Sequence, residues 1–253
     1  MHFDWGYFWS QLLTPSGAFL HGLFLTVLMA VAAQLLGSMF GIGVALCKMA
    51  PNRVLRAVAG GYIWIIRGTP LLVQIVFIYT GLAAANILRF NDIALPGGVI
   101  FPGSVQAGIL ALALNEAAYM AEIYRSGILS VDRGQFEAAK ALGMPPAMMF
   151  RYIIMPQALR IILLPIGNQF NIMLKNTTLV SVIGVSEMLL VTETINSATF
   201  RTFELYAMLA LYFLLLTSLW HLFMSWAEQR LARSSDRLSV SRKTLAGGKE
   251  AAA

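Results

Sequence analysis

The sequence is poor in charged residues and in the side chains that build catalytic or metal sites. Only 12% of its 253 residues are charged and 58% are hydrophobic, whereas roughly 25% are charged in an average soluble domain. A single cysteine excludes an internal disulfide framework, and three histidines leave little material for a Cys/His metal site. The composition therefore excludes a soluble globular protein and indicates a membrane protein, not an enzyme.

Long stretches of the chain contain no Asp, Glu, Lys or Arg. Four of them can hold the roughly 20 apolar residues that a helix needs to cross a hydrocarbon core about 30 Å thick. A fifth apolar stretch contains Lys175, which we expect to face protein or water rather than lipid. We predict an all-α membrane protein with about five spanning helices, at Phe19–Cys47, Thr69–Leu88, Ser104–Tyr124, Leu159–Val180 and Leu205–Ala227.

The basic residues predict the orientation of the chain. Fourteen of the 18 lysines and arginines fall after the first predicted span, between the third and the fourth, or after the fifth. Cytoplasmic loops are enriched in Lys and Arg, so these segments are predicted to be cytoplasmic and the N-terminus to lie outside. The net charge of +6 then reports orientation and not a nucleic-acid partner. We divide the chain into an outer interfacial N-terminus (1–18), a membrane domain (19–228) and a basic, partly disordered cytoplasmic tail (229–253).

The cytoplasmic segment 130–147 carries the signals of a short helix. Asp132 can cap it, Gln135 three residues later can complete a capping box, and Gly143 followed by Pro145 and Pro146 ends it. Such a helix is too short to cross a bilayer. It either rests on lipid headgroups or docks another protein against its alanine-rich surface.

This segment resembles a known motif. Glu137-Ala138-Ala139, with Gly143 six residues after the glutamate, is similar to the EAA loop of ABC importer permeases. Further stretches are similar to the polar amino acid branch of these permeases, which takes up histidine, arginine or glutamine, and the resemblance extends over residues 19–228. These stretches are Arg67–Gln74, Leu114–Arg125, Pro156–Arg160, Gly167–Phe170 and Leu174–Leu179.

The resemblance implies a MetI-like type I importer permease in a bacterial cytoplasmic membrane. In that family the EAA loop is a coupling helix that binds a groove of the ATP-binding subunit, so Glu137, Ala138, Ala139 and Gly143 are the expected coupling residues. The sequence has no phosphate-binding Gly-x-x-x-x-Gly-Lys-Ser/Thr loop, so ATP and magnesium are expected on a dimer of that partner. A solute-binding protein outside, membrane lipid, and a second identical or paralogous permease complete the expected partners.

Polar residues inside the third and fourth predicted spans are candidates for the substrate pathway. Carboxylates within a membrane are functional candidates by default, so Glu116, with Asn115 beside it, contacts either substrate or a buried cation, Arg67 or Lys175. Gln169 and Asn176 lie two turns apart on one helix face, with Lys175 and Thr177 beside them. Lys175 can bind a carboxylate of the substrate or of Glu116. Neutral amides argue against a purely cationic substrate and Glu116 argues for one, so the charge class stays open.

The sequence Arg67-Gly68-Thr69-Pro70 predicts a break with a structural or gating role. Thr69 can cap the following helix, Pro70 suits a first helical turn, and Gly68 adds flexibility. Arg67 either reaches the membrane interface or pairs with an acidic residue of the third span. Glu122 and Arg125, three residues apart, are predicted to pair locally.

Other functions fit less well. A permease for another small solute, such as methionine or a quaternary amine, is the main alternative, because the EAA motif does not separate these branches. A secondary transporter usually shows inverted repeats and more spans. A membrane protease needs histidine beside serine or glutamate, and the three histidines do not offer that arrangement.

Overall fold

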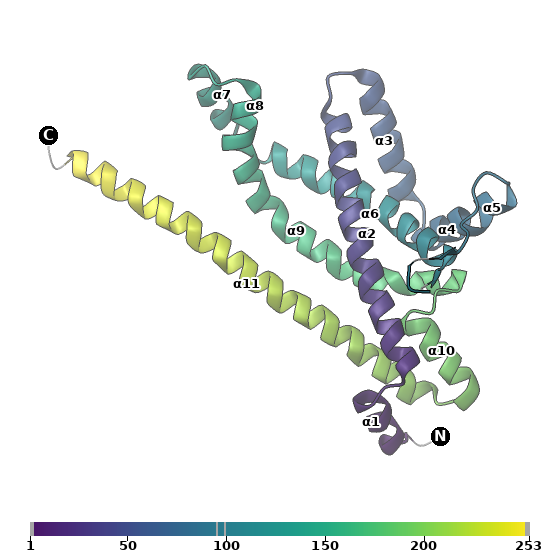
Figure 1. The fold of residues 1–253 in the computed structure, drawn as a ribbon. Helices are drawn as coiled ribbons and strands as arrows, with labels where there is room; N and C mark the ends of the chain where they lie inside the picture. The colour runs from purple at the N-terminus through teal and green to yellow at the C-terminus, as the bar shows by residue number, and fades with distance from the viewer. Residues whose placement is uncertain (1–2, 95, 99, 251–253) are drawn as a thin grey trace.

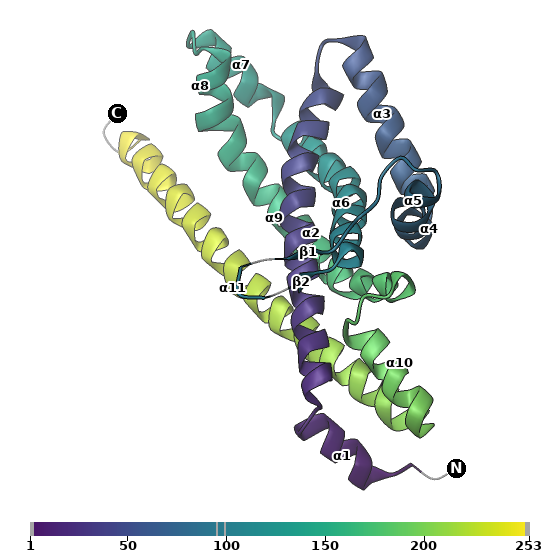
Figure 2. The ribbon, with the colours of Figure 1, turned by 45° about the vertical axis from the view of Figure 1, so that its right-hand side comes forward.

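A computed structural model describes residues 3–94, 96–98 and 100–250. Helices dominate this part of the chain, and the only described strands, β1 (Ile93–Ala94) and β2 (Ile100–Phe101), form one short antiparallel hairpin (Figure 2). Three segments have non-α helical geometry: the π-helical η1 (Phe77–Gly81) and η2 (Phe150–Ile154), and the 3-10 helix η3 (Thr177–Ile183). The α-helices are α1 (Trp5–Leu13), α2 (Gly17–Met49), α3 (Arg53–Gly68), α4 (Leu71–Val76), α5 (Leu82–Ala84), α6 (Gly103–Leu129), α7 (Arg133–Ala141), α8 (Pro146–Met149), α9 (Met155–Asn176), α10 (Met188–Thr199) and α11 (Thr202–Glu250).

Four of the five predicted spans coincide with long helices. The helices α2, α6 and α11 contain the stretches predicted near residues 19–47, 104–124 and 205–227, and the stretch 159–180 lies in α9 and the first residues of η3. By length and composition, Gly17–Met49, Pro146–Ile183 and Thr202–Arg230 suffice to cross a membrane, and a bent pair of helices makes a fourth candidate. The 27 residues of α6 are also long enough, and its crossing remains a prediction from the sequence.

The prediction of a single span at Thr69–Leu88 is wrong. The chain instead forms α3 before this stretch and turns by 108° between α3 and the segment Leu71–Ala84. The side chain of Asn52 caps α3 by accepting hydrogen bonds from the N–H groups of Val54 and Leu55. The basic residues Arg53 and Arg56 suggest a cytoplasmic loop, whereas they lie in the first turn of a helix that Asn52 caps.

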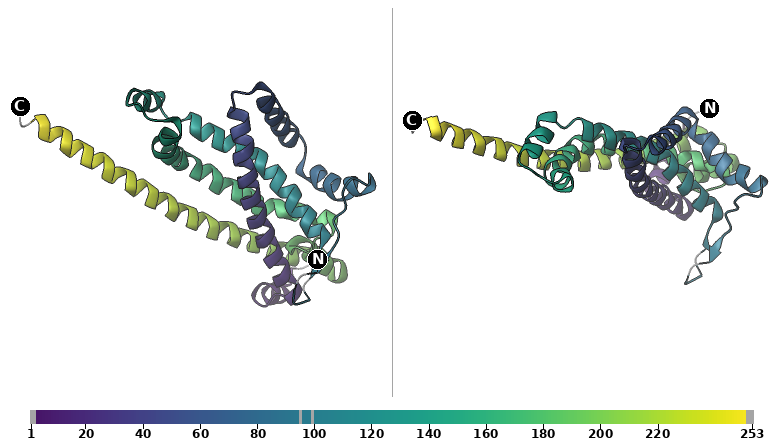
Figure 3. Two further views of the ribbon diagram at one scale, coloured as in Figure 1. Left: turned by 45° about the horizontal axis from the view of Figure 1, so that its top comes forward. Right: turned by 90° about the horizontal axis from the view of Figure 1, so that it is seen from above.

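The helices converge toward the end that carries α1 and α10 and spread toward the opposite end (Figure 1). The α2–α3 turn, α7 and the far end of α11 all lie toward that opposite end, and α11 extends away from the other helices (Figures 1 and 3). These are the three segments in which the basic residues concentrate. Within the predicted tail, α11 continues to Glu250, and residues 251–253 lie outside the described part.

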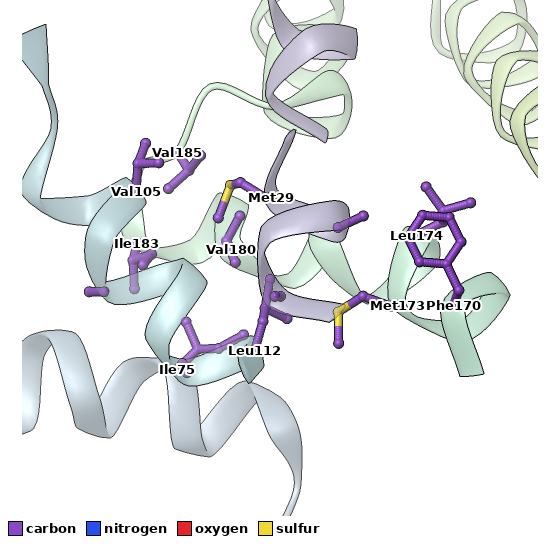
Figure 4. Packing of buried hydrophobic residues seen from close by; sticks show 14 residues of the cluster. Met29, Ile75, Val105, Leu112, Phe170, Met173, Leu174, Val180, Ile183 and Val185 are labelled. Carbon is purple, nitrogen blue, oxygen red and sulfur yellow. The ribbon is translucent and has the colours of Figure 1, made fainter. Parts of the chain in front are cut away.

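The helices α2 and α6 pack closely at the centre because glycines line their contact. A Cβ at Gly37 would lie 2.6 Å from Cβ of Glu116, and one at Gly41 would lie 2.6 Å from Cβ of Met120. Backbones approach this closely only where one helix lacks side chains. Around this contact, apolar side chains from α2, α4, α6, α9 and η3 meet in one buried cluster (Figure 4). The position of α6 in the core therefore depends on the glycines of α2.

At the other end, α1 is fastened to the start of α11. Asp4 caps α1 by accepting from the Tyr7 N–H and pairs with Arg201, whose guanidinium lies 4.4 Å from the centre of the Tyr7 ring. The Tyr7 N–H and the Arg201 side chain hold the pKa of Asp4 below its usual value. The Asp4 N–H also donates to Glu204, at 2.8 Å. These contacts fix the predicted interfacial N-terminus as a helix against α11.

We expect Gly37→Ala to destabilise the protein far more than Gly43→Ala. A methyl group at position 37 meets Glu116, whereas one at position 43 meets no atom within 4 Å. Inserting atoms into a packed core costs about 1–3 kcal/mol, and the mutant should melt several degrees lower in detergent. Equal melting temperatures of the two variants would contradict the close packing of α2 on α6.

Candidate functional site

The short helix predicted in the loop is present as α7. Asp132 caps it by accepting from the Gly134 N–H at 2.6 Å. No hydrogen bond of the Gln135 side chain is found in the described chain, so the predicted capping box is not formed. Gly143 ends the helix with a φ of +68°, and its N–H donates to the Lys140 carbonyl at 2.9 Å. A residue without Cβ adopts this left-handed conformation without strain, which explains the glycine.

The free surface of α7 differs from the predicted one. Glu137 and Ala138 are exposed, but Ala139 is only 1% exposed because it faces the chain itself. Of the two alanines, Ala138 is the exposed one in this structure, and the contact of either with another protein stays a prediction. Leu142, which is 80% exposed, adds an apolar side chain that the sequence analysis did not select. On the inner side, Phe136 packs on a small core formed by Val131, Ile154 and Ala158.

Glu116 lies between three helices and makes no ion pair among the described residues. Its side chain is fully buried, and Oε2 accepts from Nε2 of Gln169 on α9 at 3.0 Å. Lys175 is exposed, and Arg67 lies over the Tyr119 ring at 5.0 Å. The predicted alternatives of a Glu116 pair with Lys175 or Arg67 are therefore wrong, as is an acidic partner for Arg67.

Asn115, the neighbour of Glu116, binds a different element. Its Nδ2 donates to Oε1 of Gln74 on α4 at 2.9 Å, and both side chains are buried. Gln74 was noticed only as the last residue of the Arg67–Gln74 stretch, with no role. The sequence does contain a signal for this contact, because an amide such as Gln74 in an apolar segment needs hydrogen-bond partners within the protein.

The break at Gly68–Pro70 is confirmed, but its capping differs from the prediction. Pro70 itself occupies the N-cap position of α4, with no side-chain cap. Thr69 instead closes α3, and its hydroxyl donates to the Ile65 carbonyl at 2.9 Å. Because proline has φ near −65° and no N–H, it separates the two helices without continuing either one.

The remaining predicted pathway residues of α9 do not join this cluster. Lys175 is exposed and Asn176 is half-buried, whereas Thr177 is buried and donates to the carbonyl of Leu174 at 2.8 Å. The structure thus brings Asn115, Glu116 and Gln169 together with Gln74, and leaves the three residues at the end of α9 apart. The local pair of Glu122 and Arg125 is confirmed at 2.8 Å.

A second polar region lies between α9 and α11. A cavity of about 110 Å³ is lined by Leu164, Gly167, Asn168, Asn171, His221, Met224, Ser225 and Glu228. Oδ1 of Asn171 is buried and has no hydrogen-bond partner among the described residues. The two helices are joined beside this cavity, where the Trp220 indole N–H donates to the Gly167 carbonyl at 2.7 Å. We call this region the α9–α11 cavity.

Comparison with known proteins assigns the family. Residues 37–233 match the family described as "Binding-protein-dependent transport system inner membrane component". The chain belongs to this permease family. The matched range includes α6, the α3–α4 corner and α7, and so all of the polar contacts around Asn115 and Glu116.

Individual relatives place this permease among those of amino acid transporters. It is 37% identical to the arginine transport system permease protein ArgU of Corynebacterium glutamicum, over 87% of this chain and 70% of the relative. It is 33% identical to the glutamine transport system permease protein GlnP of Escherichia coli, over 92% of this chain and 98% of the relative. A crystal structure of an amino acid ABC transporter with histidines matches with a TM-score of 0.79 at 39% identity, over 91% of this chain and 100% of that one. The resemblance to amino acid ABC permeases, and with it the MetI-like fold, is confirmed.

We expect Trp220→Phe to loosen α9 from α11, whereas Trp226→Phe should have little effect. The first change removes the hydrogen bond that joins the indole to the Gly167 carbonyl, and such a bond contributes about 0.5–1.5 kcal/mol. Trp226 is 51% exposed on the same helix and serves as the control. Thermal unfolding in detergent measures both effects. If Trp220→Phe melts at the wild-type temperature, the Trp220 hydrogen bond does not hold α9 to α11.

Proposed function

We propose that this chain is the membrane-spanning subunit of an ATP-driven importer that takes up a polar amino acid, or a close derivative of one. The observation that carries this proposal is α7, a capped helix that stands at one end of the helices between two long membrane helices (Figure 1). A helix in this place offers a rigid contact to a separate protein. Relatives named for arginine and glutamine transport support a polar amino acid over methionine, a quaternary amine or a secondary transport mechanism.

In this proposal a separate ATP-binding subunit docks on α7. ATP and magnesium bind on a dimer of that subunit, since this sequence lacks a phosphate-binding loop. Glu137 is exposed toward a polar rim of the partner, while Ala138 and Leu142 offer apolar contacts beside it. Ala139 packs on the inner side of α7, and Gly143 ends the helix.

The proposed orientation places α7 in the cytoplasm of a bacterial cell and the permease in its cytoplasmic membrane. The three segments rich in Lys and Arg lie toward one end of the helices (Figure 1), as the positive-inside rule requires of cytoplasmic segments. The opposite end, with α1 and α10, then receives the amino acid from a solute-binding protein outside.

A second permease subunit, identical or paralogous, is proposed to cover the α9–α11 cavity. Asn168 is exposed and Oδ1 of Asn171 is unpaired there, and lipid satisfies neither amide. Across this interface the exposed Lys175 and half-buried Asn176 face the pathway, where the lysine binds the substrate carboxylate. Thr177, Asn115, Glu116 and Gln169 are buried in this conformation, so they reach substrate only after α6 and α9 separate. Arg67, Gly68, Thr69 and Pro70 form the gating corner.

Uptake in proteoliposomes tests the function. The complex of this permease with its ATP-binding subunit is supplied with a solute-binding protein and arginine, histidine or glutamine. We expect at least one amino acid to stimulate ATP hydrolysis several-fold and to accumulate inside. If none of the three does either, the proposed substrate class is wrong.

We expect Glu137→Arg to uncouple ATP hydrolysis from uptake, and Gln135→Arg to leave coupling intact. Residues two apart on a helix point to different sides, so the control introduces the same side chain on α7 away from Glu137. Both residues are exposed, and neither variant should lose stability. Measured as amino acid imported per ATP hydrolysed, the ratio should fall at least about five-fold in Glu137→Arg, within the range of typical coupling energies. Equal ratios in the two variants would remove Glu137 from the docking surface.

A further inference from the structure

At the α3–α4 corner, which is the break at Gly68–Pro70 between these two helices, one backbone N–H donor is missing. A side chain supplies the hydrogen bond in its place. In a continuous helix the Ile66 carbonyl would accept from the N–H of residue 70, but residue 70 is proline and has none. Nε2 of Gln74 supplies this hydrogen bond at 2.7 Å. The same nitrogen lies 3.1 Å from the Thr69 carbonyl and 2.8 Å from Thr69 Oγ1. One amide thus closes the corner on both sides of the break.

The other end of this amide binds α6. Oε1 of Gln74 accepts from Nδ2 of Asn115 at 2.9 Å. The orientation of the Gln74 amide follows from its partners, because turning it over would place its oxygen against three acceptors and its nitrogen against a donor. Both side chains are at least nine-tenths buried, so water offers no substitute for either bond.

Next to its contact with the corner, α6 also binds α9. Glu116 directly follows Asn115, and successive residues of a helix point about 100° apart. Asn115 therefore binds the corner while Glu116 binds Gln169 of α9, at 3.0 Å. From Gln169 the chain leads back through α9, η2 and α8 to the coupling helix α7. Two adjacent residues of α6 thus connect the corner to the helix that follows the coupling helix.

We infer that Gln74 is a positioning residue of the transport cycle. It binds the α3–α4 corner to α6 where α6 is bound to α9, so that the corner moves together with α9 when ATP displaces α7. The inference rests on the proposed function for the role of α7. Without the amide the corner is free to lag behind α9, and ATP is hydrolysed without productive opening of the pathway.

Substitutions of similar volume test this role. Gln74→Leu and Asn115→Leu each remove one side of the hydrogen bond, and the double variant removes both. Gln157→Leu is the matched control, because Gln157 is a half-buried glutamine whose side chain, within the described residues, donates only to the Ile153 carbonyl of its own helical segment. We expect amino acid imported per ATP to fall at least about five-fold in each single variant, and no further in the double variant. The control should keep the wild-type ratio.

Additive losses in the double variant, or a wild-type ratio in Gln74→Leu, would overturn the inference, because two residues that act through one bond must show coupled effects. If Gln74→Leu does not fold, Gln74→Met compared with Gln157→Leu decides in the same way. A purely structural role would lower the melting temperature and leave the ratio unchanged.

A distance measurement gives an answer that does not depend on the substrate. Spin labels at Gly68→Cys and Ile172→Cys, both at exposed positions, are introduced in a Cys47→Ala background of the complex with its ATP-binding subunit. With a non-hydrolysable ATP analogue, the wild type should keep one narrow distance distribution, whereas Gln74→Leu should broaden or shift it. An unchanged distribution in Gln74→Leu refutes the inference even if the amount of amino acid imported per ATP falls. Absent amino acid transport with a broadened distribution refutes the proposed substrate class and supports the role of Gln74.

Discussion

The close contact between α2 and α6 is the constraint on which the rest of the structure depends. Gly37 and Gly41 allow the two backbones to approach until Glu116 and Met120 fill the space that side chains would occupy. As a result α6 lies among α2, the α3–α4 corner and α9, and most of its residues around Asn115 and Glu116 are buried. Polar residues on α6 then have to find partners on neighbouring helices, because neither lipid nor water reaches them.

Each of these buried amides and carboxylates binds a different neighbour, so together they specify how the helices are arranged. In a membrane, apolar side chains pack almost as well against lipid as against each other, and polar contacts and small residues therefore decide which helices associate. Asn115 selects Gln74 on α4 and Glu116 selects Gln169 on α9. The polar α9–α11 cavity lies on another side of α9, which separates contacts within the subunit from those proposed between subunits.

Much of the architecture was predictable, because charge-free stretches and helix-ending residues report local physics. Asp132, Gly143 and the break before Pro70 have the predicted effect for reasons within a few residues of each. The partners of Glu116 and Arg67 were not predictable. The sequence leaves charge pairing open as one alternative for each, whereas the structure pairs Glu116 with an amide and Arg67 with an aromatic ring, which depends on distances between segments far apart in the chain. The exposed side of α7 was misjudged at Ala139 for the same reason.

The π-helical turn η2 sets the rotation of everything that follows it in α9. Its i→i+5 hydrogen bonding accommodates one residue more than an α-helical turn, and one residue corresponds to about 100° around a helix axis. An ancestral helix without that residue would present a different side of α9 to α6, with Gln169 directed elsewhere. The contact of Gln169 with Glu116 therefore depends on the number of residues in η2, and insertion or loss of a single residue there would turn the rest of α9 by about 100° and direct Gln169 away from Glu116.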